Sequence, residues 1–300
     1  ALPMAMAAAL ASVSATTYAQ TQLKDTVVTA SRTQTRADDL VSDVVVLDRA
    51  AIDGSSGRTL TEVLARNAGI QVFSNGGLGK NSSVYTRGTE TRHTILLIDG
   101  VHYGSATTGA PSWDNIPLDM IERIEVLKGP ASALYGSEAV GGVVQVFMRK
   151  GVKGFSPYAS LLVGSNSLAQ VSAGLSGGDG ALSYVFGVQK TQDKGFSATN
   201  SKAAFGNYNS DRDGFKQDAV NASVAYQINP DWRIDAGLLY ADGVSHYDDG
   251  PTGDTRTAVR TQTLRAGIEG KVLPSWKTQL RVSQANDNAS AIEAAYLPSK

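Results

Sequence analysis

The sequence contains no cysteine. Disulfide bonds, thiolate metal sites and cysteine nucleophiles are therefore all excluded. The Lys and Arg residues are scattered and the net charge is −1, so the charge pattern gives no indication of a nucleic-acid partner. No apolar stretch is long enough to form a membrane-spanning helix.

Enzyme signatures are also lacking. Gly77-Leu78-Gly79 does not have the third glycine of a dinucleotide-binding fingerprint, and no G-x-x-x-x-G-K-[ST] phosphate-binding loop occurs. The histidines, His93, His102 and His246, show no spacing typical of metal ligands. We therefore expect no catalytic residue, no redox or organic cofactor, and a protein that is not an enzyme.

The first residues have the pattern of an export signal. Met4–Val13 is apolar and small, and Thr17-Tyr18-Ala19 has small residues at the two positions that a signal peptidase reads. We interpret residues 1–19 as the remnant of a signal peptide cleaved after Ala19, which would direct the chain through the inner membrane. A soluble alanine-rich helix is the alternative. Residues 20–36 are polar around one extended run, which predicts a flexible arm.

Residues 37–152 have the composition of an α+β domain. Leu60–Ala65 is amphipathic and follows Ser and Thr residues that can cap a helix, which predicts a short helix. Thr94–Ile98 is a continuous apolar run that ends in the turn Asp99-Gly100. Further strands are expected at Val44–Leu47, Ile70–Phe73, Ser83–Tyr85, Met120–Leu127 and Val143–Met148.

Residues 153–300 have a different pattern, that of long alternating strands. In Ala219–Ile228 apolar side chains fall on one face and polar side chains on the other, and Trp232–Tyr240 repeats this pattern. Strands of about ten residues with aromatic side chains near their ends are typical of an outer-membrane β-barrel. A soluble β-sandwich also alternates, but its strands are usually shorter. The other expected strands are Tyr158–Val163, Ala169–Leu175, Tyr184–Val188, Val259–Gly270 and Trp276–Asp287, and the aromatic residues expected at the membrane interfaces are Trp232, Tyr240 and Trp276.

The connections between these strands differ in length. Asn229–Asp231 and Leu273–Ser275 are short turns, whereas Thr191–Gln217 and Asp242–Thr257 are long and polar, and the long loops of a barrel face outside. A barrel must close to leave no unpaired edge in lipid, and so few strands cannot enclose a folded domain. We therefore expect an incomplete, open half-barrel, with the C-terminal part absent from this chain.

Several short motifs carry a resemblance to a known family. Tyr85–Val101 and Ile121–Val146 resemble the plug domain of TonB-dependent outer-membrane receptors. The resemblance implies an α+β plug domain followed by antiparallel transmembrane β-barrel strands, in a bacterial outer membrane, in contact with its lipid and as a monomer. The motifs that carry it are Arg87-Gly88, Leu97-Ile98-Asp99-Gly100-Val101, Lys128-Gly129-Pro130, Tyr135-Gly136 and Gly141-Gly142.

The arm contains a segment that resembles the TonB box, through which these receptors bind the energy-coupling protein TonB. Binding of this kind adds a strand to a sheet edge, and β-branched residues favour the extended form that it needs. An ordinary edge strand would have the same composition. A non-transporting adhesin or scaffold is the rival class of protein, and it would have no use for such an arm. The residues expected to bind TonB are Asp25, Thr26, Val27, Val28, Thr29 and Ala30.

The resemblance also implies roles for charged and polar plug residues. Arg87 and Lys128 would pair with carboxylates on the barrel interior, and solvated surface charges are the alternative reading. The plug loops Ser74–Ser82 and His102–Trp113 would face the ligand. The residues expected to bind it are Asn75, Ser82, Tyr103 and Trp113.

Within the family, the cobalamin receptors are the most similar, which implies transport of a cobalamin or related corrinoid. The residues that follow the plug order of those receptors are Ser74–Gly79, Ser82-Ser83, Arg87-Gly88-Thr89 and His93. Siderophore receptors share the plug, so a ferric siderophore is the alternative ligand. The resemblance further implies structural calcium in the outer loops, because clustered carboxylates suit a hard cation. Ser197 stands where the family has a further aspartate, and solvated acidic loops are the alternative. The expected metal ligands are Asp211, Asp213, Asp242, Asp248 and Asp249.

Overall fold

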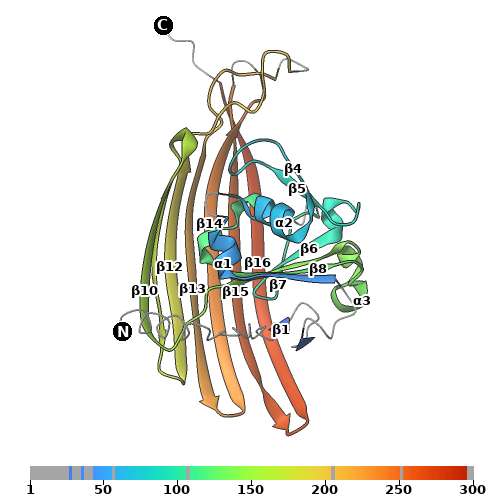
Figure 1. The fold of residues 1–300 in the computed structure, drawn as a ribbon, viewed down its shortest axis with the longest axis vertical. Coiled ribbons are helices and arrows are strands. Elements are labelled where there is room, and N and C mark those ends of the chain that lie inside the picture. The colour runs from blue at the N-terminus through green and yellow to red at the C-terminus, as the bar shows by residue number, and fades with distance from the viewer. Residues whose placement is uncertain are drawn as a thin grey trace, which may run out of the picture.

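The computed structural model describes residues 43–55, 58–105, 109–203, 207–250 and 253–295, together with the backbone of residues 27–28 and 35–36. A small mixed unit lies against the concave side of a tall curved sheet (Figure 1). We call the small unit, residues 43–150, the plug, and the sheet, residues 154–295, the wall. In the arm, β1 (Val27–Val28) pairs antiparallel with β2 (Thr35–Arg36). The expected signal-peptide remnant lies outside the described residues.

The plug is built on a sheet with the strand order β3-β8-β9-β6-β7. β6 and β9 run parallel, and every residue of both is buried. Burial on both faces explains why these two segments are continuous apolar runs rather than alternating ones. The strands are β3 (Asp43–Leu47), β6 (Thr94–Ile98), β7 (Val101–Tyr103), β8 (Ile121–Lys128) and β9 (Gly142–Met148).

Helices pack on one face of this sheet, where α1 (Arg49–Asp53) and α2 (Leu60–Ala68) contribute to the same apolar core as β6, β8 and β9. Helix α2 begins with a capping box, in which Thr59 and Glu62 bond each other's backbone N–H, and it ends at Gly69 in the left-handed conformation. The sequence therefore predicts the start of α2 correctly. The remaining elements of the plug are β4 (Gln71–Ser74), β5 (Ser82–Tyr85), α3 (Ser132–Tyr135) and the single turns η2 (Thr91–His93), η3 (Trp113–Asn115), η4 (Leu118–Met120) and η5 (Ser137–Ala139).

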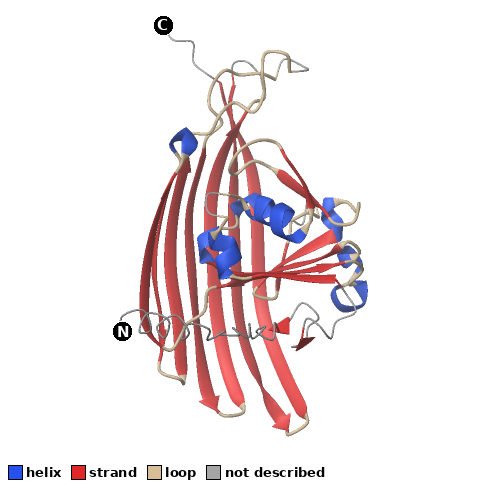
Figure 2. Ribbon diagram, in the orientation of Figure 1, coloured by secondary structure: helices blue, strands red, loops and turns tan. Residues whose placement is uncertain are grey.

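The wall is one antiparallel sheet in which successive strands are neighbours (Figure 2). Within the described residues it is open, because β10 and β16 each pair on one side only. The expectation of an open half-barrel is confirmed. The strands are β10 (Gly154–Val163), β11 (Ala169–Gly178), β12 (Leu182–Asp193), β13 (Phe215–Asn229), β14 (Trp232–Tyr247), β15 (Gly253–Leu273) and β16 (Trp276–Ala295), with η6 (Ser165–Ser167) between β10 and β11.

The two faces of the wall differ in chemistry. The exposed face carries large apolar side chains, among them Phe155, Leu161, Val282 and Leu280. Polar side chains such as those of Gln217 and Thr261 are instead buried. This is the alternation expected of a wall with one face in lipid and the other lining an interior. Within the described residues, no helix has the length and apolar character needed to cross a bilayer.

The wall strands are longer than their apolar alternation predicts. β13 begins at Phe215, β14 continues to Tyr247 and β15 begins at Gly253. The expected loops Thr191–Gln217 and Asp242–Thr257 are therefore too long at both ends. The backbone ladder continues into segments such as Ser245–Tyr247, which pairs with Thr255–Thr257 and lacks a clear apolar face. Hydrogen bonding of the ladder keeps these ends extended although neither face is apolar.

Candidate functional site between plug and wall

A cavity of about 750 Å³ lies between the plug loops and the neighbouring ends of the wall strands. Its plug side comes from the loop between β4 and β5 and from the residues around η3, and its wall side comes from β13 to β16 and the loops beside them. Four carboxylates and one ammonium among the lining residues make the described part of the lining acidic. The charged lining residues are Lys80, Asp114, Asp213, Asp248 and Asp287.

Asn75 and Ser82, both expected to bind ligand, line this cavity. The backbone N–H of Ser82 donates to Asp114 Oδ2 at 2.9 Å, which ties the β4–β5 loop to η3. Asp114 Oδ1 is buried and has no hydrogen-bond partner among the described residues. Burial raises the pKa of Asp114 to about 6, against the opposing effect of the bonds from Ser82. A carboxyl of this kind is available to a donor group on a bound molecule.

Tyr103 and Trp113 lie elsewhere. Both side chains are fully buried, and neither lines the cavity. The hydroxyl of Tyr103 is 2.8 Å from Thr261 Oγ1 on the wall, so this residue contacts the wall rather than open space. Trp113 is part of the apolar core of the plug. In this structure the two aromatic side chains are buried away from the cavity, where such large surfaces contribute most to packing, and ligand binding by them stays a prediction.

Asn115, on the plug side of the cavity, connects the plug to the wall. Its side-chain nitrogen donates to the carbonyls of Ala241 and Val259, both at 3.1 Å, and to Thr261 Oγ1 at 2.9 Å. Gln217 Nε2 in turn donates to Asn115 Oδ1 at 2.8 Å. The sequence analysis did not single out Asn115, since an asparagine in a polar loop gives no local signal of partners more than 100 residues away.

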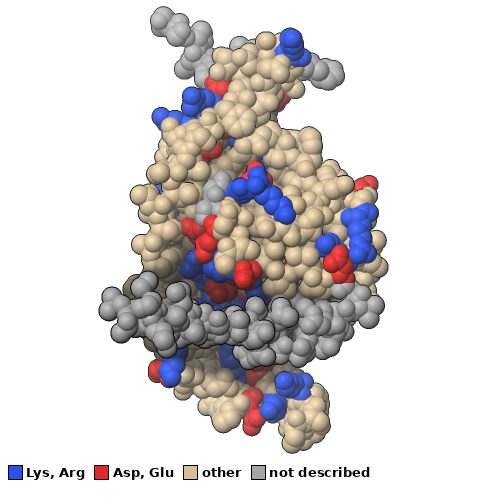
Figure 3. All heavy atoms as spheres, viewed as in Figure 1, with Lys and Arg blue, Asp and Glu red and all other residues tan. Residues whose placement is uncertain are grey.

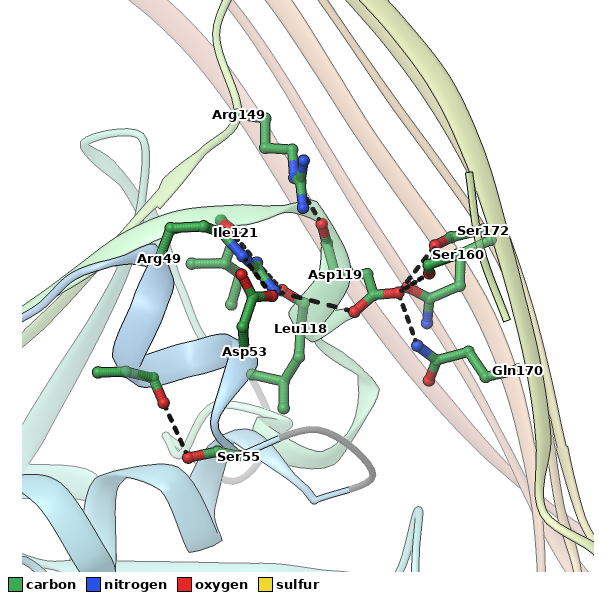
Figure 4. Close-up of polar contacts among 12 residues, drawn as sticks. Arg49, Asp53, Ser55, Leu118, Asp119, Ile121, Arg149, Ser160, Gln170 and Ser172 are labelled. Carbon is green, nitrogen blue, oxygen red and sulfur yellow. Dashed lines mark hydrogen bonds and ion pairs between the residues drawn. The ribbon is translucent and has the colours of Figure 1, made fainter. Parts of the chain in front are cut away.

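A second contact joins the plug to the first wall strands (Figure 4). Asp119 Oδ2 accepts hydrogen bonds from Ser160 Oγ at 2.9 Å, Gln170 Nε2 at 2.9 Å and Ser172 Oγ at 2.8 Å. On the plug side, Arg49 Nη2 lies 3.9 Å from Asp119 Oδ1. We call this group the Asp119 latch, and it attaches η4 to β10 and β11.

A third contact is ionic. Arg265 on β15 is paired with Asp99 on the plug at 3.3 Å and with Asp235 on β14, and all three side chains are about nine-tenths buried. Arg281 on β16 donates to the carbonyl of Asp99 at 3.3 Å. Acidic and basic side chains gather side by side where the plug meets the wall (Figure 3). The plug contributes the carboxylate and the wall contributes the cations.

Arg87 and Lys128 do not reach the described wall. Lys128 Nζ is 3.0 Å from Asp43 Oδ2 and Arg87 Nη2 is 3.8 Å from the same oxygen, so both cations pair within the plug. Arg87 is more than half exposed. Among the described residues, the expected contact between these cations and the barrel is not present, and the carboxylate partner is on the edge strand β3.

Three of the five aspartates expected to bind metal come together. Carboxylate oxygens of Asp211, Asp213 and Asp248 lie within 4.8 Å of one another, and we call these residues the acidic cluster. Asp248 Oδ1 is buried with no hydrogen-bond partner among the described residues. Ser197 Oγ donates to Asp248 Oδ2 at 3.0 Å, so the residue that replaces a family aspartate lies at this cluster.

Asp242 and Asp249 are not part of the acidic cluster. Asp242 is inside β14, where its carboxylate is 2.9 Å from Arg260 Nη2 on β15. The expectation that Asp242 belongs to a metal-binding loop is wrong because β14 continues through this position. An oxygen held by a cross-strand arginine is a poor candidate ligand.

Lys80, on the β4–β5 loop, enters the wall beside the acidic cluster. Its side chain is almost completely buried, and Nζ donates to Ser245 Oγ at 2.9 Å and to the carbonyl of Gly214 at 3.3 Å. Burial lowers the pKa of Lys80, and the carboxylates of Asp213, Asp193 and Asp248 oppose that shift. Burial raises the pKa of Asp213, and the positive charge of Lys80 opposes this rise.

Residues 36–143 match the family described as the TonB-dependent receptor plug domain. The chain is 32% identical to the vitamin B12 transporter BtuB of Photobacterium profundum over 277 residues, which cover 89% of this chain and 44% of that protein. It is 31% identical to the vitamin B12 transporter BtuB of Vibrio cholerae, over 83% of this chain and 40% of that protein.

The chain belongs to the TonB-dependent receptors. Solved structures agree on the fold. The ferripyoverdine receptor of Pseudomonas aeruginosa superimposes with a TM-score of 0.73 at 16% identity, over 91% of this chain and 38% of that one. The ferric yersiniabactin uptake receptor FyuA of Yersinia pestis gives a TM-score of 0.68 at 18% identity, over 83% of this chain and 41% of that one.

Membership of the TonB-dependent receptors confirms the bacterial outer-membrane location and the expectation that the chain is not an enzyme. The chain spans less than half the length of the curated relatives it matches. In this TonB-dependent receptor chain, Val27 and Val28 of the expected TonB-binding segment form β1, paired with β2. Asp25, Thr26, Thr29 and Ala30 lie outside the described residues.

Proposed function

We propose that the chain is the plug and first wall strands of an active transporter that takes a scarce, large ligand across the outer membrane. The observation that carries this proposal is the cavity, because one side is plug and the other is wall. A ligand that contacts both sides binds a docked plug and a displaced plug with different affinity, and only such a difference shifts the populations of the two states. Movement of the plug is then linked to occupancy of the cavity.

A cobalamin or related corrinoid is the ligand that we propose. The curated relatives are named vitamin B12 transporters, and the described lining is acidic. The structural neighbours include receptors titled for ferric enterobactin and ferripyoverdine, so ferric siderophores are the second candidate. Carboxylates in a partly enclosed site disfavour an anionic ferric catecholate more than a ligand with no net negative charge.

Calorimetric titration of the complete receptor tests the ligand. We expect saturable binding of cyanocobalamin and none of ferric enterobactin at the same concentrations. Binding of ferric enterobactin but not cyanocobalamin would reverse the assignment. Absence of binding by both would remove both candidates.

We further propose that TonB captures the arm at Asp25–Ala30 by adding a strand, since this segment is rich in β-branched residues. Deleting residues 25–30 should abolish uptake of radiolabelled cyanocobalamin by cells and leave binding at the cell surface unchanged. Loss of surface binding as well would contradict this division between binding and energy coupling.

We also propose that the acidic cluster holds one calcium ion in the outer loops. Three carboxylates within reach of one another, one of them with a buried oxygen that lacks a partner, fit a hard cation. The ion would balance the negative charge of the three carboxylates. Titration of calcium into receptor pretreated with EDTA should give one saturable site, which Asp248→Asn should weaken. A stoichiometry of zero would exclude the site.

A further inference from the structure

The burial of Lys80 needs an explanation. It is 4% exposed, although it comes from a polar plug loop from which Asn75 and Asn81 also line the cavity. An ammonium group removed from water is stable only when nearby charges and hydrogen bonds replace its hydration. Two hydrogen bonds, to Ser245 Oγ and to the carbonyl of Gly214, supply part of this.

The remaining stabilisation comes from carboxylates of the outer loops. Asp213 and Asp248 line the same cavity as Lys80, and Asp213 is itself only 3% exposed. Asp213 and Asp248 repel each other and belong to the acidic cluster, so a positive charge beside them stabilises the cluster when no metal ion is bound. Lys80 supplies a positive charge of this kind, because its ammonium group donates to the carbonyl of Gly214, the residue after Asp213.

We propose that Lys80 is a built-in counter-ion for the acidic cluster, which holds the outer loops closed without metal and weakens their affinity for calcium. The loops concerned are residues 195–203 and 207–214, between β12 and β13, and residues 248–250, after β14. The effect on calcium affinity rests on the proposed calcium site, whereas the closing of the loops by Lys80 does not.

The position of Ser197 agrees with this proposal. Its hydroxyl donates to Asp248 Oδ2, where a carboxylate would have added another negative charge. With a serine here, the acidic cluster has one negative charge fewer than it would have with an aspartate. A single lysine therefore neutralises a larger fraction of the charge of the cluster. Because Lys80 also lines the cavity, a ligand that moves the β4–β5 loop would move the counter-ion and open the outer loops.

The test measures hydrogen exchange in the outer loops of the complete receptor, with EDTA or with calcium. In wild type we expect similar protection in both. Lys80→Met keeps the apolar stem and removes the charge, so in EDTA the loop amides should exchange at least about tenfold faster, and calcium should restore protection. The affinity of Lys80→Met for calcium alone, by calorimetry, should rise about tenfold or more, as expected for removing one charge close to a divalent ion.

Two control variants separate charge from geometry. Lys80→Arg retains the charge and should behave like wild type in both measurements. Ser245→Ala removes one hydrogen bond to Nζ but no charge, and its calcium affinity should stay within about twofold of wild type. An effect of Ser245→Ala as large as that of Lys80→Met would overturn the counter-ion role.

The outcomes also separate the two proposals. Calcium binding to Lys80→Met but not to wild type would support the counter-ion and remove calcium from the function of the native receptor. Calcium binding to wild type with unchanged affinity in Lys80→Met would retain the metal site and overturn the counter-ion. Loops of Lys80→Met that stay as protected as wild type in EDTA would overturn it as well.

Discussion

Replacing Asp119 with alanine would remove the Asp119 latch between the plug and the first wall strands. One oxygen of this carboxylate accepts hydrogen bonds from Ser160, Gln170 and Ser172 at 2.8–2.9 Å. All three donors lie on β10 and β11, whereas Asp119 belongs to η4 of the plug. The substitution therefore acts on plug docking and leaves the backbone ladder of the wall intact.

The expected magnitude follows from the geometry. A hydrogen bond to a charged group contributes about 1.5–3 kcal/mol, so three independent ones would give about 5–9 kcal/mol. These three share one oxygen, the carboxylate side chain is 19% exposed, and the two serine hydroxyls, 2.6 Å apart, can bond to each other once it is gone. We therefore expect a loss of about 2–4 kcal/mol, which raises the population of undocked plug by roughly 30- to 700-fold.

Native-state hydrogen exchange measures this change directly. The buried amides of β8 and β9 exchange when the plug leaves the wall and its sheet unfolds. A loss of docking free energy therefore lowers their protection by the same amount. Asp53→Ala is the matched control, because Asp53 pairs with the same Arg49 within α1 and is 60% exposed. The control should lose under about 1 kcal/mol. Equal losses in the two variants would refute the assignment of docking energy to the contacts of Asp119 with the wall.

Three further predictions concern the same junction. Arg265→Met removes the cation that pairs with the two buried carboxylates, Asp99 and Asp235, and should weaken docking by about 3–5 kcal/mol in the exchange experiment. Arg233→Met breaks the more exposed pair with Glu269 and should weaken docking by under about 1 kcal/mol. Because the pKa of Asp114 rises from 3.8 to about 6, the folded plug holds this proton more tightly than the unfolded chain does. Plug stability in urea should therefore fall by up to about 3 kcal/mol between about pH 4 and pH 6, and Asp114→Asn should remove this slope. Gly79 and Gly69 both have positive φ, so an alanine at either position should cost roughly 1 kcal/mol of backbone strain. The added methyl group of Gly79→Ala would overlap the ring of Phe215 on the wall, whereas that of Gly69→Ala meets no atom within 4 Å. Only Gly79→Ala should therefore lower the stability of the protein by much more than the strain alone. Equal losses for Arg265→Met and Arg233→Met, or for Gly79→Ala and Gly69→Ala, would contradict the role given to Arg265 or to Gly79. A pH dependence of stability that persists in Asp114→Asn would contradict the role given to Asp114.

The architecture could be predicted because its determinants are local and repetitive. Alternation in Ala219–Ile228 requires a two-faced strand, and the continuous apolar runs at Thr94–Ile98 and Val143–Met148 require strands buried on both sides. The ends of the wall strands were not predictable in this way. The polar composition of residues 242–257 as a whole predicts a loop at Asp242, yet the ladder between β14 and β15 extends past it.

The candidate site was less predictable because its contacts are distant in sequence. Asp119 lies 41 to 53 residues from the donors that it binds, and Asp99 lies 166 residues from Arg265. No local pattern distinguishes these carboxylates from those of solvated loops. Asn75 and Ser82, predicted from the sequence to bind ligand, line the cavity, whereas no sequence pattern predicted the role of Lys80 beside them.

The distribution of charge explains why Arg87 and Lys128 were expected to dock the plug and do not in the described residues. Both pair with Asp43, and the more exposed of the two pairs, that of Arg87, contributes under about 1 kcal/mol. The contacts that reach the wall run in both directions. Asp99 and Asp119 of the plug accept from side chains of the wall, whereas Lys80 and Asn115 of the plug donate to the wall. Asp119 Oδ2 can hold the plug to two strands because serine and glutamine side chains stand in adjacent rows of the sheet and reach the same oxygen. Arg87 and Lys128 instead pair with Asp43 of the edge strand β3, so their charges act within the plug and not on its contact with the described wall.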